Sequence, residues 1–152
     1  MLTFKKILWP TDFSEAALDG LKIARELAEQ FSGEILLVHI IAPMPTLYGT
    51  AAPTGFHTPT VLKELRDTAQ KSLDEIRREK IPAEIQARTF VIHGRPAHEI
   101  VKFAAQQKAD IIVIPTHGES GWQRFVFGSV AEKVVRDAEC PVLTIRAQKE
   151  EE

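Results

Sequence analysis

Short apolar runs alternate with longer segments of helical period along this chain, and this alternation restricts its fold more than any other feature. EILLVHII at residues 34–41 has the length and composition of a buried strand, whereas apolar residues from Ser14 to Phe31 recur every three or four positions. Such alternation predicts parallel strands joined by right-handed helical crossovers. The predicted strands are residues 6–9, 34–41, 83–94, 110–115 and 141–146, and the predicted helices are residues 14–31, 60–80, 96–107 and 129–138.

These elements predict one α/β domain, a doubly wound five-stranded parallel sheet with helices on both faces. We expect the domain to span residues 1–147 and the charged residues 148–152 to form a solvated tail. Residues 42–60 contain four prolines and two glycines, which predicts a long loop. In such sheets, ligands bind beyond the carboxyl ends of the strands where the winding reverses, here between the first and fourth strands.

Charge and hydropathy argue against several classes of partner. Lys plus Arg number 19 and Asp plus Glu number 21, so no overall positive field draws the chain to nucleic acid. No window approaches the 18 apolar residues of a membrane span, and the N-terminus lacks the apolar core of a signal peptide. The single Cys140 cannot form an internal disulfide. We therefore expect a cytoplasmic protein that binds neither nucleic acid nor membranes.

The segment PTHGESGWQRFVFGSVAEKV at residues 115–134 predicts a phosphate site. It follows a predicted strand, contains glycines at 118, 121 and 128, and leads into a predicted helix. Glycine permits positive φ or close approach of another group, and a helix N-terminus favours anions. A surface loop with ordinary glycine punctuation is the alternative interpretation.

Motifs spread over the chain resemble those of the universal stress protein family. They are KKILWPTDFSE near the start, Val38 with His39, GRPAHEI at 94–100, THG followed by nine residues and then GSVAEKV, and CPVLTI near the end. The resemblance covers about residues 4–146. It implies the strand order 3-2-1-4-5 and a homodimer, often joined through the last strand. In one branch of the family it also implies an ATP site with a Gly-x-x-Gly, nine-residue, Gly-Ser/Thr pattern.

In that pattern the second glycine is Gly118 and the last pair is Gly128 with Ser129, but Pro115 replaces the first glycine. Proline has no N–H, so the hydrogen bond that a glycine N–H could donate to a ligand is lost. The resemblance implies that Asp12 accepts hydrogen bonds from the ribose hydroxyls and that the backbone of Val38 meets the edge of the adenine. It also implies that the cofactor is ATP (or AMP or ADP), with Mg²⁺ bound through the phosphates. The implied nucleotide-binding residues are Pro10, Thr11, Asp12, Val38, Ile114, Pro115, His117, Gly118, Gly128, Ser129 and Val130.

Simpler structural roles stay open for several of these residues. Asp12 could cap the following helix, and Val38 could be a core residue. Ser129 and Glu132 fit a capping box, in which the two side chains satisfy the free N–H groups of the helix. His117 and Arg124 are the nearest cations in sequence to the loop, and either could instead face solvent.

The sequence contains no motif for fast catalysis. It lacks a Walker lysine motif, a dinucleotide GxGxxG and a nucleophile elbow GxSxG. His39, His57 and His93 have no metal-ligand spacing, so we predict structural roles for them and no metal site. We expect a nucleotide-binding protein with a stress-response or signalling role, at most slow hydrolysis and no catalytic residue; no residue specifies a client protein. The alternatives are a nucleotide-free dimeric interaction protein that has lost ATP binding through Pro115, and an adenylating or ATP-hydrolysing enzyme of the same general fold.

Overall fold

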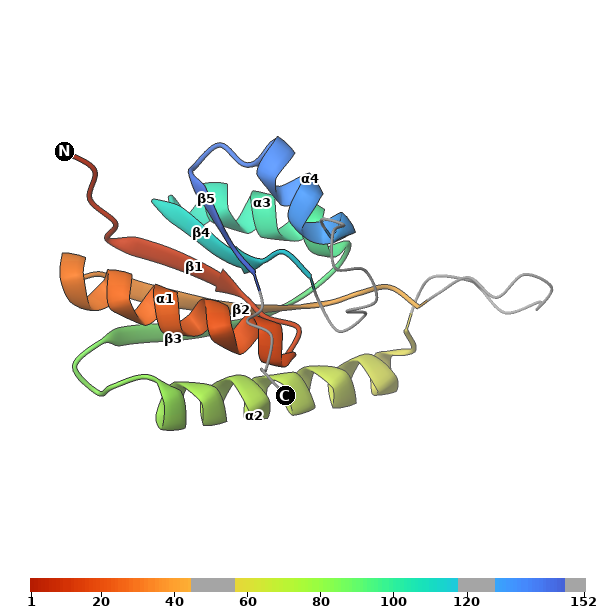
Figure 1. Ribbon diagram of the computed structural model, residues 1–152. Coiled ribbons are helices and arrows are strands. Elements are labelled where there is room, and N and C mark those ends of the chain that lie inside the picture. Colours follow the sequence, from red (N-terminus) through yellow and green to blue (C-terminus); the bar gives the residue numbers. More distant parts are fainter. Residues whose placement is uncertain (45–56, 118–127, 147–152) are drawn as a thin grey trace, which may run out of the picture.

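Five parallel strands form a single sheet with the order β3-β2-β1-β4-β5 (Figure 1). The computed structural model describes residues 1–44, 57–117 and 128–146. The predicted fold class and strand order are confirmed. In chain order the elements are β1 (Lys6–Pro10), α1 (Glu15–Phe31), β2 (Glu34–Ile41), α2 (Pro59–Lys80), β3 (Gln86–His93), α3 (Pro96–Gln107), β4 (Ile111–Pro115), α4 (Ser129–Asp137) and β5 (Val142–Ile145).

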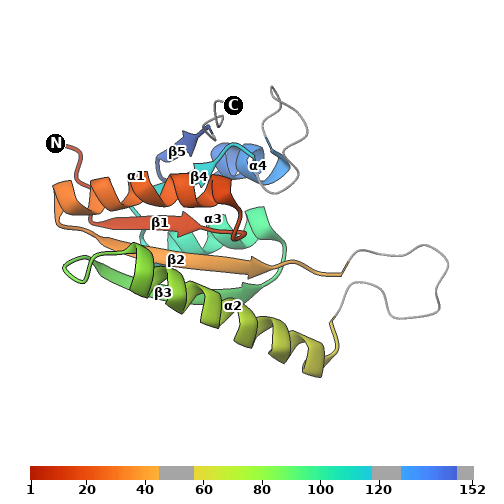
Figure 2. The ribbon, with the colours of Figure 1, turned by 60° about the horizontal axis from the view of Figure 1, so that its bottom comes forward.

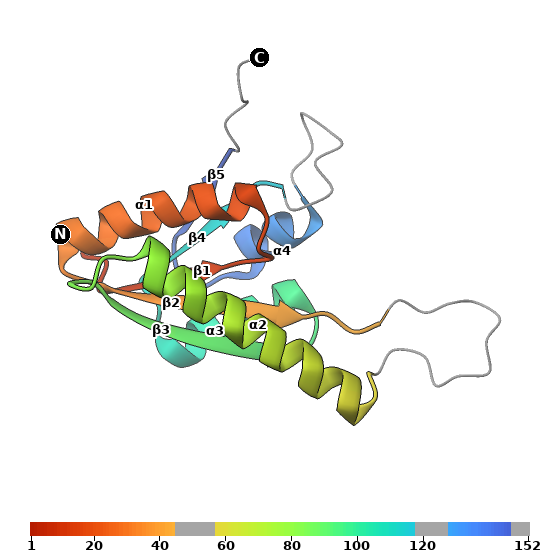
Figure 3. The same ribbon diagram turned by 90° about the horizontal axis from the view of Figure 1, so that it is seen from below.

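The helices cover the two faces of the sheet in pairs. Helices α1 and α2 lie side by side on one face, and α3 and α4 lie on the other (Figures 1 and 3). Side chains of successive strand residues point to opposite faces, so β1 supplies both cores. Ile7 and Trp9 pack towards α1, Leu8 packs towards α3, and all three are fully buried. This two-sided burial explains why the central strands are apolar without alternation.

The ends of several elements differ from the sequence-based expectations. Strand β3 begins at Gln86 and not at residue 83, because residues 82–85 form a turn closed by the Ile85 N–H and the Pro82 carbonyl. The predicted apolar face of α2 is buried only at Ala69 and Leu73, and Leu65 is 38% exposed. The first turns of α2 run past the carboxyl ends of the strands (Figure 2), where the sheet no longer covers them.

Parts of the predicted loop and tail lie outside the described residues. These are residues 45–56 of the proline-rich loop and residues 147–152 at the C-terminus. Within the described residues, no helix is both long enough and apolar enough to cross a membrane.

The amino-terminal edge of the sheet is held by contacts with the backbone of β1. The Asp110 carboxylate accepts the N–H groups of Lys5 and Lys6, each at 2.8 Å. On the other side of β1, the turn after α1 places Gly33 so close to the chain that a Cβ there would lie 2.6 Å from the Phe4 carbonyl oxygen. Glycine at position 33 is therefore required by the close approach of two backbones.

Alanine at Gly33 and at Gly20, a glycine in the interior of α1, should change stability in opposite directions. Gly33→Ala forces backbone to move and should lower the free energy of unfolding by about 1–3 kcal/mol. Gly20→Ala lies in the interior of α1, where its Cβ would meet only ordinary contacts, the nearest being Trp9 Nε1 at 3.5 Å. It should raise stability by about 0.5–1 kcal/mol. Urea unfolding of both variants tests this, and a stability loss in Gly20→Ala equal to that in Gly33→Ala would contradict it.

Candidate functional site

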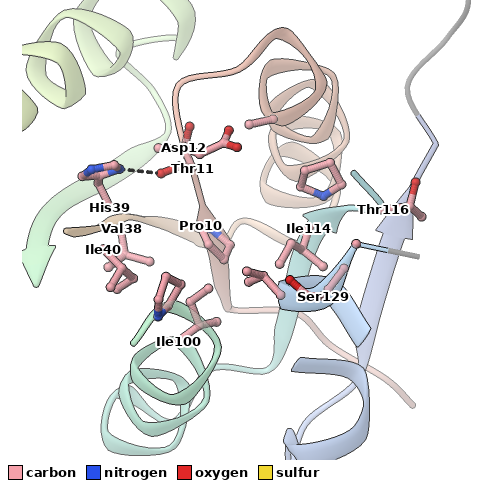
Figure 4. Close-up of a pocket in the computed structure, with 16 residues that line it drawn as sticks. Pro10, Thr11, Asp12, Val38, His39, Ile40, Ile100, Ile114, Thr116 and Ser129 are labelled. Atoms are coloured by element: carbon pink, nitrogen blue, oxygen red, sulfur yellow. Dashed lines mark hydrogen bonds between the residues drawn. The ribbon is translucent and has the colours of Figure 1, made fainter. Parts of the chain in front are cut away.

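A cavity of about 450 Å³ opens at the carboxyl ends of β1 and β4. Nine of the eleven residues predicted for the nucleotide site line it, namely Pro10, Thr11, Asp12, Val38, Ile114, Pro115, Gly128, Ser129 and Val130. His117 is described but is not among the lining residues, and Gly118 lies outside the described residues, as do Gly121 and Arg124. Figure 4 shows the side chains of Pro10, Val38, Ile40, Ile100 and Ile114 around the cavity.

The cavity exists because β1 and β4 part from each other before they end. Strand β1 pairs with β2 over its full length, but with β4 only at Ile7↔Ile111 and Leu8↔Ile112. Beyond these pairs each strand contains a proline, Pro10 in β1 and Pro115 in β4. The two strands therefore separate at the same level of the sheet.

The backbone directions show that both prolines remove a donor from this gap. N–H groups of successive strand residues point alternately to the two neighbouring strands. The Thr11 N–H donates to Val38 of β2, so the nitrogen of Pro10 faces β4. The Thr116 N–H donates to Ile145 of β5, so the nitrogen of Pro115 faces β1. Neither proline can donate across the gap, and the ladder cannot continue there.

The turn after β1 fixes the position of Asp12. The Thr11 hydroxyl accepts the Phe13 N–H at 2.9 Å, and Phe13 adopts a left-handed backbone with φ 65°. Asp12 Oδ1 accepts the Ser14 N–H at 3.0 Å, and Ser14 in turn caps α1 by accepting the Ala17 N–H. The helix cap is thus Ser14 and not Asp12, which leaves the exposed Asp12 carboxylate with a second oxygen for a ligand at the cavity.

The start of α4 differs from the capping-box alternative. Helix α4 begins at Ser129, its N-cap is Gly128, and no side chain among the described residues caps it. The capping box of Ser129 with Glu132 is therefore wrong, because Ser129 lies one position too late to be the N-cap. The Glu132 N–H donates to the Gly128 carbonyl at 2.9 Å as part of the helix. The first N–H groups of α4 precede this bond and have no intrahelical acceptor.

Gly128 is required by a contact with β4. Its N–H donates to the Thr116 carbonyl at 2.7 Å, and a Cβ on Gly128 would lie 2.9 Å from the same oxygen. Its φ is −59°, so no left-handed conformation is involved. Close approach of the two backbones explains this glycine, and it holds the start of α4 against the end of β4.

Sequence reasoning missed several lining residues, of which His39 is the most polar. Its Nδ1 donates to the Thr11 carbonyl at 2.8 Å (Figure 4). The centroid of its ring lies 4.5 Å from that of the Phe13 ring. The other missed lining residues are Ala17, Ile40, Pro96, Ile100, Thr116 and Ala131. Pro96 and Ile100 stand four positions apart on α3, a spacing that places them on one face and could have identified them.

The cavity combines an apolar wall with few charges. Among the described lining residues, Asp12 is the only carboxylate, and none is a lysine or an arginine. Val38 is fully buried, and its carbonyl already accepts the Thr11 N–H at 2.9 Å, so a ligand can use only the second lone pair of that oxygen. In the part of the chain that the structure describes, no group of three or more His, Cys, Asp or Glu side chains has metal-site geometry.

Comparison with solved structures shows where this fold occurs. The structure of the Methanocaldococcus jannaschii protein MJ0577 superimposes with a TM-score of 0.78 at 26% identity, covering 97% of this chain and 99% of that chain. More distant structures show the fold alone: a universal stress protein in complex with cAMP (TM-score 0.64, 16% identity, 95% of this chain and 98% of that chain) and one from Archaeoglobus fulgidus in complex with dAMP (TM-score 0.61, 24% identity, 95% and 99%).

Comparison of sequences gives the family. Universal stress protein MJ0531 of Methanocaldococcus jannaschii is 33% identical over 97% of this chain and 85% of its own length. The model of the universal stress protein family matches residues 3–146. The chain therefore belongs to the universal stress protein family.

Proposed function

We propose that this protein binds an adenine nucleotide, ATP or one of AMP and ADP, in the cavity between β1 and β4, and acts in a stress response or in signalling. One observation supports this most directly: the N-terminus of α4, which no side chain of the described residues caps, and the Asp12 carboxylate line the same largely apolar cavity. The N-terminus of α4 favours phosphate, Asp12 can accept from a sugar hydroxyl, and the apolar wall suits a base. The cAMP and dAMP bound by two more distant relatives agree with this choice of ligand.

The proposed pose places the phosphates at Gly128, Ser129 and Val130. The first N–H groups of α4 would donate to phosphate oxygens, and Ser129, which is exposed at the helix start, adds a hydroxyl. Mg²⁺ would be held through the phosphates. The base would lie over Val38, near Ile40 and Ile100 of the apolar wall.

Fast hydrolysis is not part of the proposal. Phosphoryl transfer needs a group that orients or deprotonates the nucleophile and positive charge on the transferring phosphoryl group. The described lining residues include no lysine or arginine, and Asp12 already accepts a backbone N–H of its own turn. We infer that any hydrolysis is slow and that the protein works by binding.

Pro115 favours one alternative, a dimeric interaction protein without nucleotide, because its nitrogen faces the gap and cannot donate. Mass spectrometry of the small molecules released from purified, denatured protein distinguishes this alternative from the nucleotide-binding proposal. Stoichiometric adenine nucleotide supports binding. An empty protein that also gives no calorimetric response to ATP, ADP or AMP would support the alternative.

Asp12→Asn should weaken nucleotide binding without unfolding the protein. The asparagine side-chain oxygen can still accept the Ser14 N–H, but the charged acceptor offered to the ribose is lost. We expect affinity for ATP to fall roughly tenfold, equivalent to about 1.4 kcal/mol, by calorimetry. Asp19→Asn removes a carboxylate that pairs with Lys22 on α1 and does not line the cavity, so it serves as the control. Equal affinities of Asp12→Asn and the parent would remove Asp12 from the site.

Pro115→Gly should strengthen nucleotide binding and weaken the fold. The new N–H faces β1 across the gap and could contribute about 0.5–1.5 kcal/mol, or roughly two- to tenfold in affinity. Glycine also enlarges the entropy of the unfolded chain, so stability should fall by up to about 1 kcal/mol. Calorimetry with ATP measures the first effect and urea unfolding without ligand the second. Unchanged ATP affinity would mean that a donor at position 115 does not reach the ligand.

We further propose a homodimer joined through β5. This strand lies at the edge of the sheet, paired on one side with β4, and all four of its residues are partly exposed. An edge strand presents backbone donors and acceptors to a second strand. The carbonyls of Pro141 and Ile145 face β4, so the backbone of Thr144 faces the open edge.

Thr144→Pro should therefore dissociate the dimer and leave the β4–β5 ladder intact, because it removes an N–H that points away from β4. Leu143 is a poorer position for such a test, since it packs against the core beneath α1. Light scattering should give twice the mass of one chain for the parent and one chain mass for the variant. A parent that is monomeric at all micromolar concentrations would contradict the proposal.

A further inference from the structure

Two histidines far apart in the sequence lie together beyond the ends of β2 and β3. His57 precedes Thr58, the N-cap of α2, and His93 is the last residue of β3. The centroids of their rings are 5.5 Å apart, with 55° between the ring planes. His93 is placed by its pairing with Ile41 of β2, and His57 is placed by a hydrogen bond to Ala42, the next residue along.

The hydrogen bond of His57 fixes which of its nitrogens is free. Nε2 lies 3.0 Å from the Ala42 carbonyl oxygen, which can only accept, so Nε2 holds the hydrogen. In the neutral ring Nδ1 then has a lone pair. This Nδ1 is shut off from solvent and has no hydrogen-bond partner among the described residues.

His93 has a matching atom. Its Nε2 is also buried and, within the described residues, has no partner, so the two rings do not bond to each other. A buried polar atom without a partner costs about 1–3 kcal/mol. Two such atoms on neighbouring imidazoles indicate a ligand that both can bind.

We propose that His57 Nδ1 and His93 Nε2 bind one divalent transition-metal ion of the Zn²⁺ class. Imidazole nitrogen suits Zn²⁺, Cu²⁺ and Ni²⁺, whereas Mg²⁺ and Ca²⁺ prefer oxygen. With metal–nitrogen distances of about 2.0–2.1 Å, two imidazoles on one tetrahedral ion have ring centroids about 5 Å apart, close to the separation seen here. Donation of the second ring N–H of His57 to a backbone carbonyl is the usual way in which a metal-binding imidazole is oriented.

The described residues supply two side-chain ligands, so we expect water to complete the coordination and the ion to be exchangeable. Its binding would join the end of β3 to His57, which lies just before α2. Because His93 pairs with Ile41 at the end of β2, the ion would also link the two ends of the long connection between β2 and α2. The site lies apart from the β1–β4 cavity, because neither His57 nor His93 lines that cavity. The proposal is therefore independent of nucleotide binding.

Calorimetric titration of chelator-treated, nucleotide-free protein with ZnCl₂ tests the proposal. The parent should bind one Zn²⁺ per chain, and His57→Ala and His93→Ala should each bind it at least tenfold more weakly. His98→Ala is the matched control, because it removes an exposed histidine of α3 that has no neighbouring histidine ring among the described residues. Asp12→Asn should also bind Zn²⁺ as the parent does, and MgCl₂ should give no response at this site.

A second measurement keeps the test valid if a variant is unstable. Zn²⁺ should raise the thermal unfolding midpoint of the parent and of His98→Ala, and should leave that of His57→Gln and His93→Gln unchanged. Electron paramagnetic resonance with Cu²⁺ should show coupling to two imidazole nitrogens in the parent and to one in either single variant. A double variant, His57→Ala with His93→Ala, that binds Zn²⁺ as tightly as the parent would overturn the proposal.

Discussion

The parting of β1 and β4 is the constraint on which the candidate site depends. Both strands are central and buried, and two residue pairs hold them together before Pro10 and Pro115 remove the donors that would extend the ladder. Further backbone pairing between β1 and β4 would narrow this gap. Here each facing edge lacks an N–H, so the gap stays open at the end of the sheet where the winding reverses.

The parts around this gap are positioned mainly through backbone contacts. Thr11 and Thr116, both 6% exposed, follow the two prolines at equivalent positions. The Thr11 carbonyl holds His39, and the Thr116 carbonyl holds Gly128 at the start of α4. The turn with the Asp12 carboxylate thus lies at one end of the cavity, and the N-terminus of α4 lies at the other. Helix α3 forms part of the apolar wall.

The sequence predicted this arrangement well wherever a local pattern was sufficient. The place of the cavity was predictable because strand ends in a doubly wound sheet meet at one edge, and because the glycine-rich segment stands between a strand and a helix. The individual residues were those that the family resemblance implies, and nine of the eleven line the cavity. The cap of α4 was less predictable. Ser129 and Glu132 have the spacing of a capping box, but the contact of Gly128 with Thr116 starts the helix one residue earlier. A tertiary hydrogen bond decided that boundary, and the apolar spacing on α2 likewise did not show how far the helix extends past the sheet.

The order of apolar runs and helical segments determined the fold class by itself, because burying strands on both faces and covering them with helices leaves few topologies. The prolines at positions 10 and 115 determined that neither residue could donate a backbone hydrogen bond. Only the tertiary structure decided that these prolines face each other, that Gly128 lies against Thr116, and that His57 lies beside His93. Each of these contacts joins residues that are far apart in the sequence. Strand register and helix packing bring them together, and these depend on the whole sheet and not on any local spacing.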